Sequence, residues 1–320
     1  MSDNDRNSSI LAKANKLDKM KIVVYVLGGM VAILFFVSIF LLKDGVHEEQ
    51  GYILLIISII AAIVLVFVGD LIMHNAKKLK CIYKKKCKEE LVPAVLQSIF
   101  DSVVYNYESG FTYQYILDMD LLGMPFFLPK SFIDNYVKSC NYIHAEYKGV
   151  SFKCADVSIY APRSRGMTVY IFYGRIMELH STSYASTKLK IYSRNFYDVK
   201  GELSPRKSGK VQITGAKTFD NEFYMRCDSE EQFKTIMTSE MMEKLELFHH
   251  LYDEFAIEFY NDKLYVAVDI PSRKSASDGY MKPESFEPDY SWGPDYQYQF
   301  YKIKKDTKFI TDVIDIFCRE

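Results

Sequence analysis

Two long apolar runs near the N-terminus constrain the fold more than any other feature of this sequence. They extend over residues 22–42 and 51–68, and neither contains a charged side chain. A helix needs about 20 apolar residues to cross roughly 30 Å of hydrocarbon, and helices of soluble domains are seldom apolar on every face. The sequence therefore predicts two transmembrane helices, at residues 22–42 and 51–73.

The segments around these runs predict how the helices are connected. Residues 1–21 are mostly polar and are expected to form a disordered cytoplasmic N-terminus, and the run after them is too long for a cleaved signal peptide. Residues 43–50 form a short acidic connection. So short a connection predicts an antiparallel transmembrane hairpin with an extracytoplasmic turn.

Lysines flank the two runs unevenly, and positive residues stay on the cytoplasmic side of a membrane. Four lysines adjoin the first run, one lies in the connection and seven follow the second run. We therefore expect a multi-pass membrane protein with both termini in the cytoplasm. Near the surface, each lysine attracts anionic lipid headgroups by about 1 kcal/mol. The candidate lipid contacts are Lys77, Lys78, Lys80, Lys84, Lys85, Lys86 and Lys88.

The charge of the remaining chain argues against a nucleic-acid partner. Residues 1–88 carry a net charge of +6, whereas the other 232 residues carry −7. An acidic domain lacks the basic footprint that phosphate backbones require. The same lysine-rich stretch contains Cys81 and Cys87, but no Cys or His pair lies near enough to complete a zinc site. In the cytoplasm we expect the six cysteines to be thiols, mostly buried as small apolar side chains.

No motif in the sequence supports a catalytic, cofactor-binding or metal-binding residue. His250 and Glu254 lie one helical turn apart beside His249, a spacing that offers two metal ligands. The favoured interpretation is a polar helix end, where histidine suits the negative end of the helix dipole. No phosphate-binding loop or nucleophile elbow occurs. No cofactor is predicted, and an enzymatic activity remains an open but unsupported alternative.

The soluble part is predicted to be α+β, with a mainly antiparallel sheet and flanking helices. Residues 74–110 are expected to form lysine-rich juxtamembrane and docking helices, and residues 111–320 a cytoplasmic α+β domain. The docking helix is predicted from a helical repeat of apolar residues at Val92, Val95, Leu96, Ile99 and Val103.

Two segments predict β-hairpins. Within residues 141–160 the turn is Lys148-Gly149, and within 255–268 it is Asn261-Asp262, each between alternating apolar residues. Since hairpins outnumber strand–helix–strand units, an antiparallel sheet is expected.

Other segments predict single elements. Residues 167–180 form a strand in which Gly174 marks a bulge or a close backbone approach, and 187–193 alternate as a half-exposed strand. A strand over 221–227 leads into one helix capped by Asp228, and a final helix covers roughly 305–318.

A proline-rich and tyrosine-rich segment over residues 270–300 contains the only tryptophan of the chain. Loops of this length are often functional, and aromatic side chains on them can anchor a partner. The candidate partner-binding residues are Tyr290, Trp292 and Tyr296. The alternative is a surface loop whose aromatic side chains fold back on the domain.

Several pieces of the chain occur in a recognisable order: the two-helix hairpin, "YKKKCKEELVPAVL", "YIHAEYKGVSFKCADVSIY", "VYIFYGRIMEL", "NEFYMRCDSEEQFKTIMTSEMMEKL" and "IEFYNDKLYVAV". In this order they resemble a family of bacterial two-helix inner-membrane proteins known as domain of unknown function 3137. The resemblance covers most of residues 20–317. It implies a membrane-anchored cytoplasmic domain and no assigned activity.

Two functions are consistent with these observations. The favoured hypothesis is a membrane-anchored interaction module that binds a protein partner or anionic lipid headgroups at the inner leaflet. The alternative is an accessory subunit of a membrane transport or envelope-synthesis complex that acts through its transmembrane helices. A homo-oligomer is compatible with either hypothesis.

Overall fold

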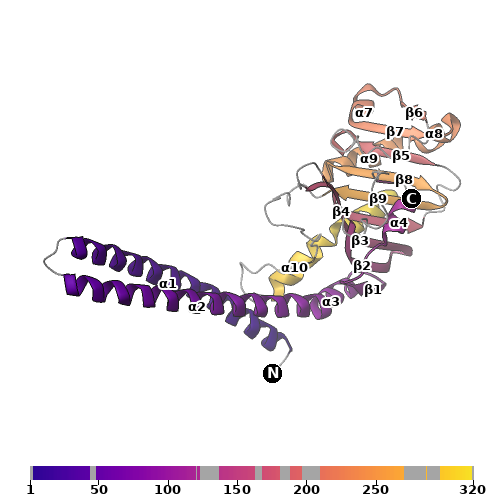
Figure 1. The fold of residues 1–320 in the computed structure, drawn as a ribbon. Coiled ribbons are helices and arrows are strands. Elements are labelled where there is room, and N and C mark those ends of the chain that lie inside the picture. Colours follow the sequence, from indigo (N-terminus) through magenta and orange to yellow (C-terminus); the bar gives the residue numbers. More distant parts are fainter. Residues whose placement is uncertain are drawn as a thin grey trace. The chain divides into compact units, whose positions relative to one another are not determined.

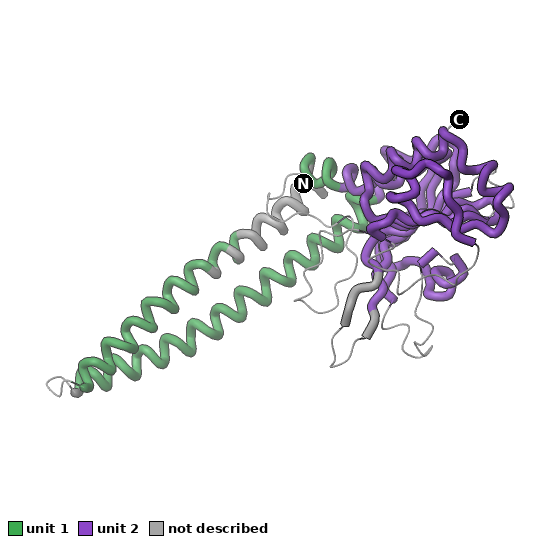
Figure 2. The backbone as a smooth tube through the Cα atoms, turned by 90° about the horizontal axis from the view of Figure 1, so that it is seen from above, with its two compact units in different colours: residues 1–92, 287–302 green, residues 93–286, 303–320 purple. Residues whose placement is uncertain are grey.

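A computed structural model describes residues 3–43, 48–119, 121–122, 137–162, 168–180, 188–196, 210–269, 286 and 296–318. The chain divides into two compact units (Figure 2). Unit 1 contains residues 1–92 and 287–302, and unit 2 contains residues 93–286 and 303–320. Each unit is described separately below.

Unit 1 is dominated by helices α1 (Asp3–Lys43) and α2 (Glu48–Lys86), which lie side by side (Figure 1). A Cβ atom placed on Gly51 would meet Leu42, and one placed on Gly69 would lie 3.4 Å from Val24. These two contacts place the helices antiparallel. Both helices contain a segment long and apolar enough to cross a membrane, by length and composition.

The N-terminal segment differs from the sequence prediction. Residues 3–21 belong to α1, whereas their polarity predicted disorder. The segment "ILAKANKLDKM" is rich in alanine, leucine and lysine, which are strong helix formers. An adjoining apolar helix provides the nucleus from which such a segment continues.

Helix α2 continues through the lysine-rich stretch as far as Lys86. After α2 come the π-helical turn η1 (Cys87–Leu91) and the short helix α3 (Val92–Gln97). Within this turn the Val92 N–H bonds to the carbonyl of Cys87. Pro93 has no N–H to donate to the preceding turn, so a local change of helical pitch keeps the chain helical past it.

Unit 2 is built on one β-sheet whose strands differ in length. Its described strands are β1 (Ser102–Asn106), β2 (Val137–Tyr147), β3 (Val150–Pro162), β4 (Thr168–His180), β5 (Leu189–Ser193), β6 (Lys210–Gln212), β7 (Phe223–Cys227), β8 (Phe255–Tyr260) and β9 (Lys263–Asp269). They form one nine-stranded sheet in the order β1-β2-β3-β4-β9-β8-β5-β7-β6, and every neighbouring pair is antiparallel. The predicted α+β class with an antiparallel sheet is confirmed.

Both predicted hairpins occur, with the predicted turns. Lys148 and Gly149 join β2 to β3 with φ angles of 52° and 79°, and Asn261 and Asp262 join β8 to β9 with 49° and 59°. Two consecutive positive φ angles match the right-handed twist of the strands, and Asn, Asp and Gly tolerate them best. These turns are therefore decided by local sequence.

One face of the sheet is covered by helices α9 (Ser239–Leu251) and α11 (Lys308–Phe317). Phe248 of α9 links the layers, because its ring lies 5.0 Å from that of Phe255 in β8 and 5.3 Å from that of Phe317 in α11. We call this the α9 face. By strand register it also carries Arg175 and Asp156.

The opposite face carries helix α4 (Tyr113–Asp118) and is called the α4 face. Its core joins Ile116 and Met119 to Val157, Ile176 and Ala267 from three central strands. Thr112 caps α4 by accepting a hydrogen bond from the Tyr115 N–H at 3.2 Å. The capped helix thereby presents Tyr115 to the sheet.

Two predicted helical segments are corrected. The docking helix ends at Gln97, and Val103 lies in strand β1, where pairing with β2 satisfies its backbone and suits its β-branched side chain. The predicted single helix after β7 is divided into α8 (Glu230–Ile236), capped by Ser229 rather than Asp228, and α9, capped by Thr238. The remaining described helices are α7 (Lys217–Glu222) and α10 (Tyr296–Asp306).

Candidate functional site

The seven candidate lipid-contact lysines do not share one environment. Six lie on α2, where Lys77, Lys78 and Lys85 are exposed and the other three are partly buried. Lys85 forms an ion pair with Glu89 at 3.6 Å, one turn along the helix. Lys88 lies in η1 and is buried, so it is removed from the candidate surface. The sequence does not distinguish Lys88 from the neighbouring lysines. The change in helical pitch that turns its side chain inward cannot be recognised from the composition of this stretch.

The candidate partner-binding residues are mostly beyond the described part of the chain. Tyr290 and Trp292 lie outside the described residues, and Tyr296 is the first residue of α10, with a side chain that also lies outside. Their role therefore remains a prediction.

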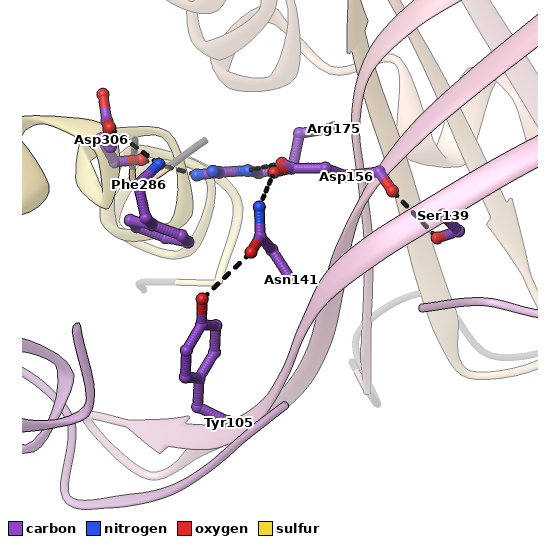
Figure 3. Close-up of polar contacts among 7 residues, drawn as sticks. All are labelled: Tyr105, Ser139, Asn141, Asp156, Arg175, Phe286 and Asp306. Atoms are coloured by element: carbon purple, nitrogen blue, oxygen red, sulfur yellow. Dashed lines mark hydrogen bonds and ion pairs between the residues drawn. The ribbon is translucent and has the colours of Figure 1, made fainter. Parts of the chain in front are cut away.

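A buried polar network on the α9 face is the first candidate site that the structure adds (Figure 3). Asp156 of β3 lies directly across from Arg175 of β4, and the Arg175 Nε donates to Asp156 Oδ1 at 2.9 Å. Both side chains are buried. A buried ion pair is stable only if other hydrogen bonds satisfy its remaining polar atoms, and here they do.

The carboxylate side of this pair is completed by a bulge in β2. The register of β2 shifts between Cys140 and Ile143, and Asn141 within the bulge has a φ of 55°. This turns its amide toward the pair, so that Asn141 Nδ2 donates to Asp156 Oδ2 at 2.7 Å. The Tyr105 hydroxyl of β1 donates to Asn141 Oδ1 at 3.0 Å. Bulges commonly re-aim side chains at functional positions.

The guanidinium group of Arg175 also contacts two segments that follow much later in the sequence, at Phe286 and at Asp306. Arg175 donates through one terminal nitrogen to the backbone carbonyl of Asp306 at 2.5 Å, and its guanidinium carbon lies 4.9 Å from the centre of the Phe286 ring. The Phe286 N–H donates to Asp306 Oδ2 at 3.0 Å. The Tyr105 ring packs edge-on against the Phe286 ring, with 6.1 Å between the two ring centres. Arg175 therefore anchors fully buried Phe286, which lies within the predicted aromatic segment and four residues before Tyr290.

The environment keeps Arg175 charged and Cys154 protonated. Burial alone would lower the pKa of Arg175, but the charges of Asp156 and Asp306, the nearby Cys154 and the hydrogen bond to Asp156 together outweigh burial and raise the pKa. Burial raises the pKa of the nearby Cys154 thiol to about 12. A thiol this weakly acidic is no nucleophile at neutral pH. The network is suited to holding segments in place rather than to reaction chemistry.

A second polar cluster lies on the α4 face around Glu178. The side chain of Glu178 is buried, and its two oxygens receive the Tyr115 hydroxyl and the ammonium groups of Lys153 and Lys263, the latter at 3.5 Å and 3.3 Å. Burial pushes the pKa of Glu178 upward, but the hydrogen bond from Tyr115 and the two lysine charges lower it overall. The carboxylate is therefore ionised at neutral pH.

The polar row continues across the sheet to a second buried ion pair. Lys190 of β5 lies opposite Glu258 of β8, with 3.8 Å between ammonium and carboxylate. The prediction that Lys190 lies on the exposed side of its strand is wrong, since every residue of β5 is buried. Alternation alone does not show that a second layer covers the polar side of a strand.

All six cysteines are thiols, and four of them are buried, as predicted: Cys87, Cys140, Cys154 and Cys227. The His249 ring packs against the rings of Phe223 and Phe255, at 5.4 Å and 5.9 Å. Within the described part of the chain, no three His, Cys, Asp or Glu side chains are grouped to hold a metal ion.

The family match to this chain covers part of the sheet domain and does not include the apolar helices α1 and α2. Residues 170–318 match the model of a family described as "Protein of unknown function (DUF3137)". The resemblance predicted from the sequence is thereby confirmed for this part, and the pieces before residue 170 lie outside the match.

Two further comparisons add little to the DUF3137 match. A search of curated proteins finds no match. A crystal structure of the mycobacterial trehalose monomycolate transport factor A, TtfA, is 12% identical, with a TM-score of 0.35 over 72% of this chain and 96% of that chain. A TM-score of this size does not establish a shared fold.

The DUF3137 segment contains only part of each polar cluster. Arg175 and Glu178 lie within it, whereas their partners Asp156 and Lys153 precede it. Sequence reasoning did not single out these residues. The available signal was a charged residue within an otherwise apolar strand, as in "KCADVSIY" and "YGRIMEL". Pairing such charges requires the strand register, which the sequence does not state.

Proposed function

We propose that the protein is a membrane-anchored interaction module, with α1 and α2 crossing the inner membrane. The carrying observation is the exposure of apolar side chains around both helices, including Ile33 at 64%, Phe36 at 69% and Phe67 at 72%. A helix that is apolar on every side requires either a protein core or lipid around it. Only 6% and 11% of the two apolar segments are buried within the protein, which favours lipid.

The few polar groups within the apolar segments support the same environment. Ser38 Oγ donates to the carbonyl of Phe35 at 2.6 Å, and Ser58 Oγ donates to that of Leu55 at 2.8 Å. In hydrocarbon no water is present to satisfy a hydroxyl, so bonding to the preceding turn removes the penalty.

The first test is the membrane topology. The lysine asymmetry favours an orientation with both termini in the cytoplasm. Reporter fusions placed after Glu49 and after Glu320 are expected to read outside and inside respectively. An external signal from the fusion at Glu320 would overturn the proposed orientation.

The aromatic segment that follows Phe286 is the proposed binding part of the module. The anchoring of Phe286 by Arg175 supports a role for the segment that follows, because it fixes one point of the chain near Tyr290, Trp292 and Tyr296. Trp292→Ala is expected to weaken partner capture from native membranes without lowering the melting temperature. Trp292 is the only indole, so a blue-shifted, quencher-protected emission from the protein in detergent would argue against an available docking residue.

The alternative, an accessory subunit that acts through its transmembrane helices, makes the opposite truncation prediction. Its supporting observation is the open space around Gly28 and Gly29 of α1, where no described atom lies within 4 Å of an added Cβ. Small residues allow close approach of another transmembrane helix. If partner capture survives the removal of residues 1–75, the interaction module stands. If capture requires residues 20–75, the accessory subunit replaces it.

A further inference from the structure

The α4 face brings several basic and tyrosine side chains to one end of the sheet. Strand register places Lys153, Glu178 and Tyr265 side by side in one row across β3, β4 and β9. In the adjacent row on the same face, His180 lies opposite Lys263. We call Lys153, Lys263 and Glu178, with Tyr115, the lysine–glutamate cluster.

Two ammonium groups in this cluster share one carboxylate oxygen. Lys153 Nζ and Lys263 Nζ lie 3.5 Å and 3.3 Å from Glu178 Oε1, while the Tyr115 hydroxyl bonds to Oε2. Two positive charges therefore face one negative charge. Each ammonium has three donors, and among the described residues this carboxylate is the ion-pair partner of both.

The cluster is layered, with the carboxylate below and the ammonium groups above. The side chain of Glu178 is 1% exposed, whereas those of Lys153 and Lys263 are 34% and 30% exposed. Exposed His180 lies beside Lys263 on the neighbouring strand. Solvent therefore reaches the two donors that share Glu178, but not Glu178 itself.

Tyrosine rings hold the two lysines in position. Lys153 Nζ lies 5.7 Å from the centre of the Tyr115 ring, and Lys263 Nζ lies 5.9 Å from that of Tyr265. Cation–π contact and the shared carboxylate limit the freedom of both side chains, which lowers the entropy lost when a ligand binds.

We propose that Lys153 and Lys263 form a binding site for a phosphate group, with Glu178 as the buried counter-charge that holds them. Both nitrogens lie close to one oxygen, so a single anion with several oxygens can accept a hydrogen bond from each. Charge-assisted bonds to phosphate are among the stronger polar contacts in proteins. The phosphate is carried either by a soluble compound or by a lipid headgroup.

The surrounding charge makes this excess specific to the cluster. Residues 89–320 carry a net charge of −7, so the domain as a whole repels anions. On the same face, Glu146 lies opposite Ser151, Glu258 pairs with Lys190, and the charge of Asp118 on α4 reaches Tyr265. Within this acidic domain, the two ammonium groups that share Glu178 form a local basic pair.

The test is a titration of the full chain in phosphatidylcholine nanodiscs with inorganic pyrophosphate. The wild type is expected to bind saturably, and Lys153→Gln/Lys263→Gln to bind at least about tenfold more weakly, because charged hydrogen bonds are lost. The matched control is Lys234→Gln/Lys308→Gln, which removes two exposed, ion-paired lysines elsewhere in unit 2. An absence of saturable binding, or an equal loss in the control, would overturn the proposal.

The single variants Lys153→Gln and Lys263→Gln supply an independent arm if the double variant fails to fold. Each removes one of the two donors that a single phosphate accepts from, so each is expected to weaken pyrophosphate binding several-fold; unchanged binding by both folded variants contradicts the site. Phosphatidic acid in the nanodiscs separates the two sources. If it blocks pyrophosphate binding in the wild type and in the control variant, the site takes a headgroup; if binding is unaffected, it takes a soluble phosphate.

Discussion

The two units of this protein depart from the usual distribution of side chains in opposite ways. In unit 1, α1 and α2 expose apolar side chains on every side. In unit 2, the sheet buries ionisable ones, namely Arg175 with Asp156 and Lys190 with Glu258. Soluble proteins rarely do either.

The difference teaches which kind of surroundings each unit requires. An exposed apolar surface is stable in an apolar solvent, so the exposed side chains of α1 and α2 favour the proposed lipid environment. A buried charge is stable when hydrogen-bonding and oppositely charged partners surround it, so the sheet requires a fixed arrangement of its strands. Substitutions that exchange these features between the units test the comparison directly.

The largest effect is expected from Arg175→Met. It leaves the carboxylate of Asp156 buried without its opposite charge, which destabilises a fold by about 3–5 kcal/mol. Unfolding by denaturant in detergent measures the loss. Lys234→Met, at an exposed position, is the control and should change stability by less than about 0.5 kcal/mol. A loss at Arg175 as small as the control's would show that the ion pair is not a structural requirement.

Ile60→Arg tests the opposite unit with the opposite change. An arginine near the centre of a transmembrane helix raises the free energy of insertion by about 2.5–3.5 kcal/mol. We expect a smaller fraction of the protein to resist alkaline extraction from membranes. Ile213→Arg places the same charge at an exposed apolar position of unit 2 and should leave the extracted fraction unchanged. Equal behaviour of the two variants would remove the distinction between the units.

A smaller, pH-dependent effect is expected at Glu178. Burial raises its pKa, but Tyr115, Lys263 and Lys153 lower it further than burial raises it. The ionised carboxylate therefore stabilises the fold above its unfolded pKa of about 4.3, and this contribution is lost as the pH falls through the lowered folded pKa. Glu178→Gln should be less stable than the wild type at neutral pH, with a difference that narrows on acidification. A constant difference down to pH 3 would contradict this.

The smallest effect is expected at the exposed lysines of α2. Lys77→Gln, Lys78→Gln and Lys85→Gln should each weaken attraction to anionic vesicles by about 1 kcal/mol at low salt. The effect should fade at 1 M salt, where the screening length falls to about 3 Å. Buried Lys88 is the internal comparison, since its substitution should leave the salt dependence unchanged. Equal slopes for all four variants would contradict the division made by burial.

Local features of this protein could be predicted from its sequence. The two hairpin turns follow from Lys148-Gly149 and Asn261-Asp262, because Gly149, Asn261 and Asp262 tolerate the positive φ angles that these turns require. Gly174 was predicted as a bulge or a close backbone approach, and the latter is found, since a Cβ there would collide with the carbonyl of Val268. Each of these requirements is met within a few residues along the chain or by a single neighbouring strand.

Long-range features were not predictable in the same way. Val103 reads as the end of a helix, yet pairing with Ala145 places it in the edge strand β1. Lys190 reads as exposed, yet Glu258 lies opposite it and both are buried. In each case a partner more than 40 residues away decides the environment.

The sequence alone therefore determined the apolar length and the flanking charge of α1 and α2, which depend on neighbours along the chain. It also determined the helical repeat of α11 and the two tight turns. Only the tertiary structure decided which charges are buried and paired. Arg175 meets Asp156 and holds Phe286 because strand pairing and the return of the chain after β9 bring them together. Contacts between distant segments depend on register, and a shift of one residue would move every side chain to the other face.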